Sequence, residues 1–249
     1  MKALITGASS GIGRDMAKVL SNMGYDLILV ARRKNRLEEL KETLHTNVTI
    51  IPLDISSTYN CAKLYEKVKN EDIDIVINNA GFGAYGEFAK INIDQELDMI
   101  DLNIKATHVI TKLFLNDFKK KNKGYILNVA SIASYLPGPM MATYYATKAY
   151  VRSLSEAINY ELKDQNSNVY VGVLCPGPVK TEFNKVANVK FSVKGLKSMD
   201  VAEYAIANMF KRKPVIIPGL KMKINRFFSR FMSEKALCKL AYNAQTKRK

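Results

Sequence analysis

Short hydrophobic runs alternate with longer stretches of helical periodicity along most of the chain. The runs are rich in Val, Ile and Leu, and they predict strands at residues 3–5, 26–30, 48–52, 73–77, 125–129, 169–174 and 215–217. Their nearly continuous apolar character is typical of strands that are covered on both faces. Between them, apolar residues recur every three or four positions and predict helices at residues 12–23, 35–45, 59–70, 95–119, 142–162 and 201–211.

This alternation of strands and helices predicts an α/β fold. Right-handed crossovers between successive strands would produce a doubly wound parallel sheet of about seven strands. The sequence has no internal repeat and no change in composition that would mark a linker. We therefore expect one domain over residues 1–220, followed by an extension over residues 221–249 that is not a separate domain.

The C-terminal extension differs in pattern and in charge. Ile224, Phe227, Phe228, Phe231 and Met232 have the spacing of one helical face, which predicts an amphipathic helix with a basic opposite face. The chain has a formal net charge of +15, and residues 211–249 hold twelve Lys and Arg residues against one Glu. Three partners fit such a helix: its own domain, a second subunit, or an anionic membrane surface. No nucleic acid is expected, because no recognition module accompanies the charge.

The rest of the composition narrows the class of protein. No apolar run approaches the ~20 residues of a membrane-spanning helix, and the first predicted strand begins too early for a signal peptide. The three cysteines, Cys61, Cys175 and Cys238, lie far apart and lack the spacing of metal ligands. We expect a reduced, cytoplasmic protein, with peripheral membrane contact as the alternative that the extension leaves open.

A glycine-rich turn, Thr-Gly-Ala-Ser-Ser-Gly-Ile-Gly, joins the first predicted strand to the first predicted helix at residues 6–13. Glycine permits a tight turn and lets backbone N–H groups approach a pyrophosphate. The N-terminus of the helix then supplies unpaired donors and the positive end of its dipole. The sequence therefore predicts a dinucleotide site whose contacts include Gly7, Ser9, Ser10, Gly11, Ile12 and Gly13.

The end of the second predicted strand bears on the choice of cofactor. Enzymes that use NAD usually carry an Asp or Glu there, about 20 residues past the glycines, to hold the ribose hydroxyls. This chain has Arg32 and Arg33 instead. A guanidinium can bind a 2′-phosphate through charge-assisted hydrogen bonds. We expect NADP(H) to be preferred, with NAD(H) as the alternative if both arginines are only solvated loop residues.

Candidate chemistry comes from Tyr and Lys four residues apart. A Tyr can protonate a carbonyl oxygen during reduction, and a Lys one helical turn away would lower its pKa from about 10 by favouring the phenolate. Three pairs have this spacing: Tyr59/Lys63, Tyr65/Lys69 and Tyr144/Lys148. Only Tyr144 begins a helix shortly after a strand that ends near a serine, Ser131. Because chemistry gathers at the carboxyl ends of parallel strands, context selects Ser131, Tyr144 and Lys148.

Taken in order, these segments resemble the short-chain dehydrogenase/reductase family, in its single-domain branch of about 250 residues. The resemblance rests on the glycine turn, on Asn-Asn-Ala-Gly at residues 78–81, on Asn103, on the Ser/Tyr/Lys set, and on Pro176-Gly177 with Val179 and Thr181. It extends from residue 1 to about residue 183 and implies a Rossmann-type fold. The longer C-terminus departs from the shorter members, so their assembly modes do not transfer directly. We expect a homodimer or a homotetramer.

The resemblance also implies a role for each residue. Tyr144 would donate or accept the proton, and Ser131 would position the substrate oxygen. Lys148 would bind the nicotinamide ribose and lower the pKa of Tyr144, while Asn103 would hold a water that links Lys148 to solvent. Asp54 would contact the adenine and Thr181 the carboxamide. The remaining predicted cofactor contacts are Arg32, Arg33, Asn79, Ala80, Gly81, Pro176, Gly177 and Val179.

The function that follows is an NADP(H)-dependent oxidoreductase that transfers a hydride between the nicotinamide and a carbonyl or alcohol substrate. Residues 133–142 and 182–198 are rich in apolar side chains, including Phe183, Phe191 and Val193. Such a lining would suit a hydrophobic ketone, aldehyde or acyl chain, although the same residues could simply close the core. A non-catalytic dinucleotide sensor on the same fold is the alternative function. The intact Ser131, Tyr144 and Lys148 set favours the enzyme.

Overall fold

The computed structural model describes residues 1–189 and 195–245. Within these residues, seven strands form one sheet in the order β3-β2-β1-β4-β5-β6-β9, and every neighbouring pair is parallel. The predicted seven-strand parallel sheet is therefore confirmed. The strands are β1 (Lys2–Thr6), β2 (Asp26–Ala31), β3 (Val48–Pro52), β4 (Ile75–Asn78), β5 (Gly124–Val129), β6 (Val169–Leu174) and β9 (Val215–Ile216).

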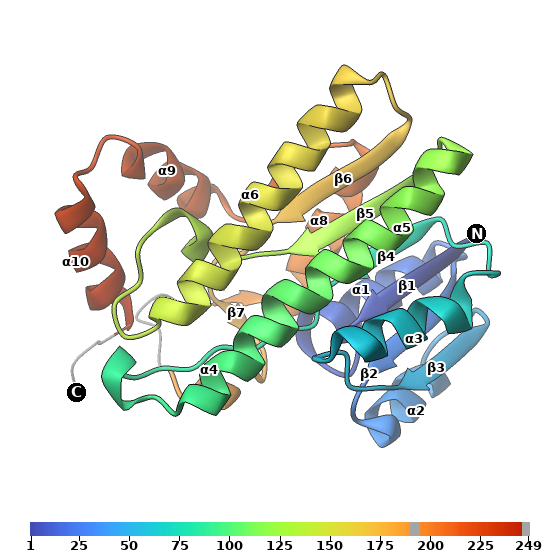
Figure 1. Ribbon diagram of the computed structural model, residues 1–249, viewed down its shortest axis with the longest axis horizontal. Coiled ribbons are helices and arrows are strands. Elements are labelled where there is room, and N and C mark those ends of the chain that lie inside the picture. The colour runs from blue at the N-terminus through green and yellow to red at the C-terminus, as the bar shows by residue number, and fades with distance from the viewer. Residues whose placement is uncertain (190–194, 246–249) are drawn as a thin grey trace.

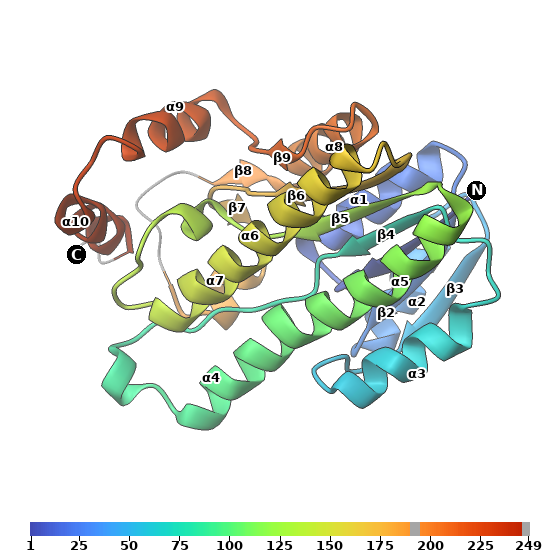
Figure 2. The same cartoon turned by 45° about the horizontal axis from the view of Figure 1, so that its top comes forward.

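Helices cover both faces of the sheet (Figures 1 and 2), which explains the continuous apolar character of the strands. One core cluster joins the sheet to α1 (Gly11–Asn22), α2 (Lys34–Glu42) and α8 (Ser198–Phe210). A second cluster joins its other face to α3 (Thr58–Val68), α5 (Thr107–Lys121) and α6 (Ala142–Asp164). The apolar stripes of these helices are the periodic positions seen in the sequence.

The prediction of one continuous helix over residues 95–119 is wrong. The structure has α4 (Ile93–Ile100), a π-helical stretch (Asp101–Ala106) and then α5, and short 3₁₀ helices at Phe88–Lys90 and Ile132–Tyr135. Asn103 is fully buried within the π-helical stretch. A period of 3.6 residues does not distinguish an α-helix from one that widens locally, and such widening is common at functional sites.

The strand order places the site. The chain leaves β1 toward β2 on one side and reaches β4 on the other, so β1 and β4 are neighbours at the point where the order reverses. In open parallel sheets, ligands bind outside the carboxyl ends of the strands at this switch point. The glycine turn follows β1 and the Asn-Asn-Ala-Gly segment follows β4, so both lie at this crevice.

The C-terminal part of the chain adds elements beyond these strand ends. A second, two-stranded parallel sheet pairs β7 (Val179–Lys180) with β8 (Leu196–Lys197), and α7 (Phe183–Val186) lies between them in sequence. The amphipathic helix predicted near residues 224–232 is α9 (Leu220–Ser229), and α10 (Glu234–Gln245) follows it without having been predicted. Figure 1 shows α9 and α10 at the end of the molecule toward which the strands run.

Candidate active site

A cavity of about 680 Å³ lies at the carboxyl ends of the strands and gathers almost all of the predicted site residues. Among the described residues, only Gly13 and Asn103 of the predicted set lie outside its lining. The predicted residues that line it are Gly7, Ser9, Ser10, Gly11, Ile12, Arg32, Arg33, Asp54, Asn79, Ala80, Gly81, Ser131, Tyr144, Lys148, Pro176, Gly177, Val179 and Thr181.

The glycine turn has the backbone that a dinucleotide needs. Gly7 and Gly11 have φ of +64° and +56°, in the left-handed region that favours glycine. A Cβ atom on Gly7 would lie 2.8 Å from the Ala80 Cα atom. The turn is therefore pressed against the segment after β4, and α1 begins at Gly11 with its N-terminus at the cavity. These features fit the pyrophosphate of a nicotinamide dinucleotide.

Asn79 and Gly13 fix the position of this turn. The Asn79 amide donates to the carbonyl oxygens of Thr6 and Gly7, both at 3.1 Å. The Thr6 hydroxyl accepts from the backbone N–H groups of Asn79 and Ala80 at 3.0 and 3.1 Å. A Cβ atom on Gly13 would lie 2.3 Å from the Asn79 Nδ2 atom, so Gly13 lets α1 pack against this amide and does not face the cavity.

The two arginines after β2 point to different partners. Arg32 is largely exposed, and its guanidinium lies 3.6 Å from the Asp54 carboxylate. The Arg33 guanidinium donates to the Ser9 hydroxyl at 3.1 Å and lies 2.9 Å from the Glu182 carboxylate. That hydrogen bond with Arg33 holds the pKa of Glu182 below its ordinary value. Arg33 is thus the cation that reaches the glycine turn.

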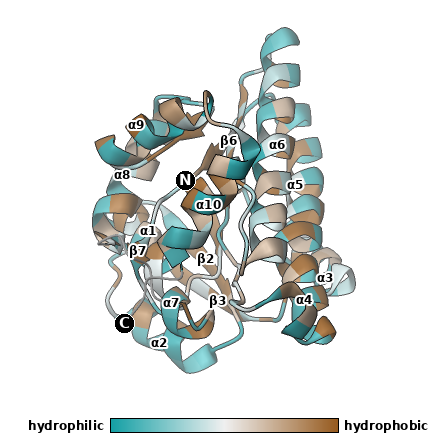
Figure 3. Ribbon diagram, turned by 90° about the vertical axis from the view of Figure 1, so that its left-hand side faces the viewer, coloured by the Kyte–Doolittle hydropathy of each residue, from teal (hydrophilic) through white to brown (hydrophobic). Residues whose placement is uncertain are grey.

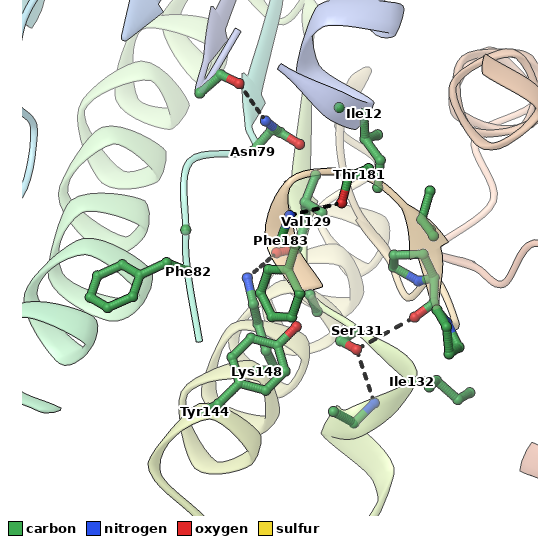
Figure 4. Close-up of a pocket in the computed structure, with 18 of the residues that line it drawn as sticks. Ile12, Asn79, Phe82, Val129, Ser131, Ile132, Tyr144, Lys148, Thr181 and Phe183 are labelled. Carbon is green, nitrogen blue, oxygen red and sulfur yellow. Dashed lines mark hydrogen bonds between the residues drawn. The ribbon is translucent and has the colours of Figure 1, made fainter. Parts of the chain in front are cut away.

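Ser131, Tyr144 and Lys148 come together in the cavity from β5 and α6 (Figure 4). The Ser131 hydroxyl accepts from the Ala133 N–H at 3.1 Å and donates to the Pro176 carbonyl oxygen at 3.4 Å. The Lys148 ammonium donates to the Val129 carbonyl oxygen at 2.9 Å and lies 5.9 Å from the centroid of the Tyr144 ring. Since Ser131 follows β5 and Val129 ends it, this strand end orients two of the three side chains.

Burial governs the protonation of this group. It raises the pKa of Tyr144 above its ordinary value, and a hydrogen bond with Ser131 opposes that effect only in part. Burial also lowers the pKa of Lys148 to about 8. The expected lowering of the Tyr144 pKa by Lys148 stays a prediction, because burial is the largest cause of the shift in this structure and acts in the opposite direction. The raised pKa keeps the Tyr144 side chain as a neutral phenol at neutral pH.

Asn103 acts on the neighbouring backbone. Its side-chain oxygen accepts from the Phe82 N–H at 3.1 Å, and its amide donates to the Phe82 carbonyl oxygen at 2.9 Å and to the Thr147 hydroxyl at 3.0 Å. A Cβ atom on Gly81 would lie 2.8 Å from the Asn103 Oδ1 atom and 3.3 Å from the Lys148 Nζ atom. The Asn103 side chain therefore clamps the cavity wall to α6.

The other two Tyr/Lys pairs lie on α3, away from the cavity. Tyr59 is 74% exposed. The Tyr65 hydroxyl donates to the Asp117 carboxylate at 2.6 Å, and this bond raises the pKa of Tyr65 to about 12. Neither tyrosine is among the residues that line the cavity.

The end of the cavity around Phe183 includes residues that the sequence did not indicate. Tyr135, Leu136, Phe183 and Val186 line it, as the two apolar segments suggested, whereas Phe191 and Val193 lie outside the described residues. The Phe183 ring centroid is 5.2 Å from that of Tyr144. The unforeseen lining comes from α9 and α10: Met222, Asn225, Arg226, Ser229, Leu240, Ala241, Asn243 and Ala244.

Two contacts fix α9 and α10 over this end of the cavity. The Arg226 guanidinium stacks on Tyr135, 4.0 Å from the ring centroid. The buried Gln245 amide donates to the hydroxyl of Tyr145, next to Tyr144 on α6. No signal for Gln245 or Ala241 was visible in the sequence, because these contacts depend on the path of the chain after β9.

Comparisons with known proteins identify the family of this chain. A family model described as short chain dehydrogenase matches residues 1–190. The NADP-dependent 3-hydroxy acid dehydrogenase of Schizosaccharomyces pombe is 34% identical over 86% of this chain and 88% of its own. A short-chain dehydrogenase from Sphingobium yanoikuyae in complex with NADPH has a TM-score of 0.83 at 28% identity, over 92% of this chain and 93% of the other. The bulky-bulky ketone specific alcohol dehydrogenase from Comamonas testosteroni has a TM-score of 0.78 at 28% identity, over 94% of both chains.

The chain belongs to the short-chain dehydrogenase/reductase family. It is an NAD(P)-dependent oxidoreductase that acts on CH–OH groups and their carbonyl counterparts. Its substrate is a small molecule. Among the helices of residues 1–189 and 195–245, none is both long and apolar enough to span a membrane.

Proposed function

We propose that this protein is an NADP(H)-dependent carbonyl reductase or alcohol dehydrogenase in which Tyr144 is the acid/base. The observation that carries the proposal is the meeting of Tyr144, Ser131 and Lys148 in one cavity that also contains the glycine turn. A bound nicotinamide supplies or accepts the hydride. The chain itself supplies the proton, the orientation of the oxygen and the exclusion of water.

Each polar side chain has a separate task in this proposal. Tyr144 donates its phenolic proton to the carbonyl oxygen in reduction and takes it back in oxidation. Ser131 donates a hydrogen bond to the same oxygen, which turns the substrate carbonyl toward Tyr144. Lys148 holds the ribose hydroxyls, and its ammonium replaces the proton that Tyr144 loses. The hydrogen bonds of Asn103 keep Lys148 within reach of Tyr144. The water that relays protons between Lys148 and solvent would bind at the π-helical stretch that contains Asn103.

The preference for NADP(H) rests on Arg33 together with Arg32. Arg33 contacts Ser9 of the glycine turn, so a phosphate bound there would lie beside its guanidinium and compete for it with Glu182. No acid follows β2 to hold a ribose 2′-hydroxyl. The yeast relative is named NADP-dependent, and the Sphingobium structure contains NADPH. Asp54 completes the adenine end of the site, and Thr181, whose side chain lies beside Gly11, contacts the carboxamide.

A hydrophobic ketone, aldehyde or acyl chain is the proposed substrate class. The substrate end of the cavity is lined by Tyr135, Leu136, Phe183 and Val186, with α9 and α10 closing it. Two relatives of this chain act on a 3-hydroxy acid and on ketones with two bulky groups. In this proposal residues 1–220 carry the chemistry, and the extension over residues 221–249 shapes the substrate end.

The test is the oxidation of NADPH in the presence of aromatic and medium-chain ketones and aldehydes. The reaction is followed as the loss of the absorbance of the reduced nicotinamide at about 340 nm. We expect turnover with the hydrophobic members and little with short, polar carbonyls. Tight NADPH binding without turnover of any carbonyl, or of the matching alcohols with NADP⁺, would favour a dinucleotide sensor and contradict the enzyme.

A further inference from the structure

The helix α9 and the turn after it present two different faces. Met222, Asn225 and Ser229 face the substrate end of the cavity. On the opposite side, one helical turn apart, Ile224, Phe227, Phe228 and Phe231 face outward with 45%, 55%, 60% and 75% of their surface exposed. The inner face therefore explains how α9 packs on its own domain, and the outer face remains uncovered within the described residues.

The outward residues form a continuous aromatic crest. The ring centroid of Phe227 lies 5.5 Å from that of Phe228 and 5.5 Å from that of Phe231. Leu220 and Met232 extend the crest at its two ends, with 73% and 38% of their surface exposed. A contiguous exposed apolar patch often marks an interaction site, whereas single exposed apolar residues are common and need no such explanation.

Cations border the crest. Lys221, Lys223 and Arg230 are exposed on α9 or directly after it, at helical positions between the outward and the inward faces. Lys235 and Lys239 are exposed on α10, and Glu234 is the one acidic residue of the two helices. Figure 3 looks onto this end of the molecule and shows hydrophobic and hydrophilic segments side by side along α9 and α10.

We propose that this crest docks the protein on a membrane surface rich in anionic lipid. Aromatic and aliphatic side chains on one helical face, bordered by Lys and Arg, are the pattern of a helix that lies in the headgroup region. Anionic headgroups would pair with the bordering cations while the phenylalanines enter the acyl boundary. Because no helix of the described residues could span a bilayer, the contact is peripheral.

The charges argue against a second copy of this chain as the occupant. In a two-fold dimer the same patch meets itself, so the bordering cations of both copies would face one another. Like charges brought together at an interface oppose association. An anionic surface turns the same charges into an attraction. Docking would also bring the substrate end of the cavity, lined by the inner face of α9, next to the lipid.

Co-flotation of the full-length protein with vesicles tests the proposal without any activity measurement. We expect the protein to float with vesicles of equal parts phosphatidylcholine and phosphatidylglycerol, to remain below vesicles of phosphatidylcholine alone, and to be released by high salt. Replacing the three crest phenylalanines (Phe227→Ala, Phe228→Ala and Phe231→Ala) should remove most of the flotation. A matched triple variant (Tyr59→Ala, Phe88→Ala and Tyr160→Ala) replaces exposed aromatic residues elsewhere and should float like the wild type.

Two outcomes would overturn the proposal. The first is wild-type protein that fails to float with the anionic vesicles, or a crest variant that floats as well as the wild type. The second is light scattering without vesicles in which the crest substitutions convert a dimer to a monomer, because a second copy would then cover the crest. Thermal unfolding of both triple variants verifies that they fold. Failure of docking would leave the carbonyl panel unaffected, since that assay is run in solution without lipid.

Discussion

Arg33 and Glu182 form an ion pair of 2.9 Å in the lining of the cavity, between the end of β2 and the segment that precedes α7. Arg36 lies 3.9 Å from the same carboxylate. The segment after β7 is thereby tied to the arginines at the adenine end of the groove. A cofactor phosphate bound at Arg33 would compete with Glu182 for one guanidinium, which makes this pair a direct probe of the cofactor preference.

The preference for NADPH should depend more on Arg33 than on Arg32. Arg33→Ala removes the guanidinium that contacts Ser9, and we expect about a tenfold or greater loss of NADPH affinity, the scale of one charge-assisted hydrogen bond. NADH affinity should change little. Arg32→Ala is the matched variant and should have a smaller effect, because that side chain is 73% exposed. Fluorescence titration with both cofactors measures the four affinities, and equal losses for NADPH and NADH would remove the phosphate assignment.

Glu182→Gln should strengthen NADPH binding. The substitution keeps the size of the side chain but removes the negative charge that now occupies Arg33 and would repel a 2′-phosphate. We expect a severalfold lower dissociation constant for NADPH and an unchanged value for NADH. Glu38→Gln, on the exposed surface of α2, serves as the control for a change of net charge alone. Weaker NADPH binding in Glu182→Gln would mean that Glu182 supports the cofactor site instead of competing for it.

Lys148 should give the folded protein a distinctive dependence on pH. Burial lowers its pKa to about 8, below the value of about 10.4 expected in the unfolded chain. Between these two values the unfolded state binds more protons than the folded state, so this group makes stability rise with pH in that window. Below pH 8 the folded state must bury a charge.

The variant Lys148→Met tests this linkage by thermal unfolding. At pH 7 we expect it to unfold at a higher temperature than the wild type, and the difference should shrink as the pH rises from about 8 to about 10. Lys163→Met, at an exposed position on the same helix, should show no such convergence. A difference between Lys148→Met and the wild type that widens with pH would contradict the burial of a charged amine.

Gly81→Ala should damage both stability and activity. The new Cβ atom would lie 2.8 Å from the Asn103 oxygen, whose side chain is already bonded to Phe82 and Thr147. Overpacking of this kind costs about 1–3 kcal/mol. Gly86→Ala is the control, because its Cβ would meet only the apolar side chain of Ile91, with the Cγ1 atom at 3.0 Å. Equal unfolding temperatures for the two variants, measured in the same buffer, would show that the Asn103 clamp is not tightly packed.

Much of the fold followed from the sequence because its signals are local. The buried strands are continuous apolar runs, and the glycine turn with its flanking strand and helix is a contiguous motif. Tyr144 and Lys148 lie one turn apart on a helix, so their proximity is fixed by helix geometry. The position of Ser131 follows from the strand that ends before it, since parallel strands bring their carboxyl ends to one edge.

The remaining features depend on contacts between distant parts of the chain. The Arg33–Glu182 pair joins residues that are far apart in the sequence, and nothing at either position indicates the other. The pKa of Tyr144 is raised by burial, which acts in the direction opposite to the effect expected from Lys148. The helix α10 is held by Ala241 and Gln245 against α6, a contact that only the three-dimensional path of the chain creates.

The central claim is that Tyr144 is the acid/base of this enzyme, and the pair Tyr144→Phe and Tyr145→Phe tests it most directly. Both substitutions remove one hydroxyl from adjacent buried rings, but only the pKa of Tyr144 is influenced by Ser131, whereas the Tyr145 hydroxyl accepts from Gln245. With the best carbonyl of the panel, we expect Tyr144→Phe to lower kcat by about 10²–10⁴-fold while NADPH still binds, and Tyr145→Phe to keep most of it. Substantial turnover in Tyr144→Phe, or an equal loss in Tyr145→Phe, would contradict the account.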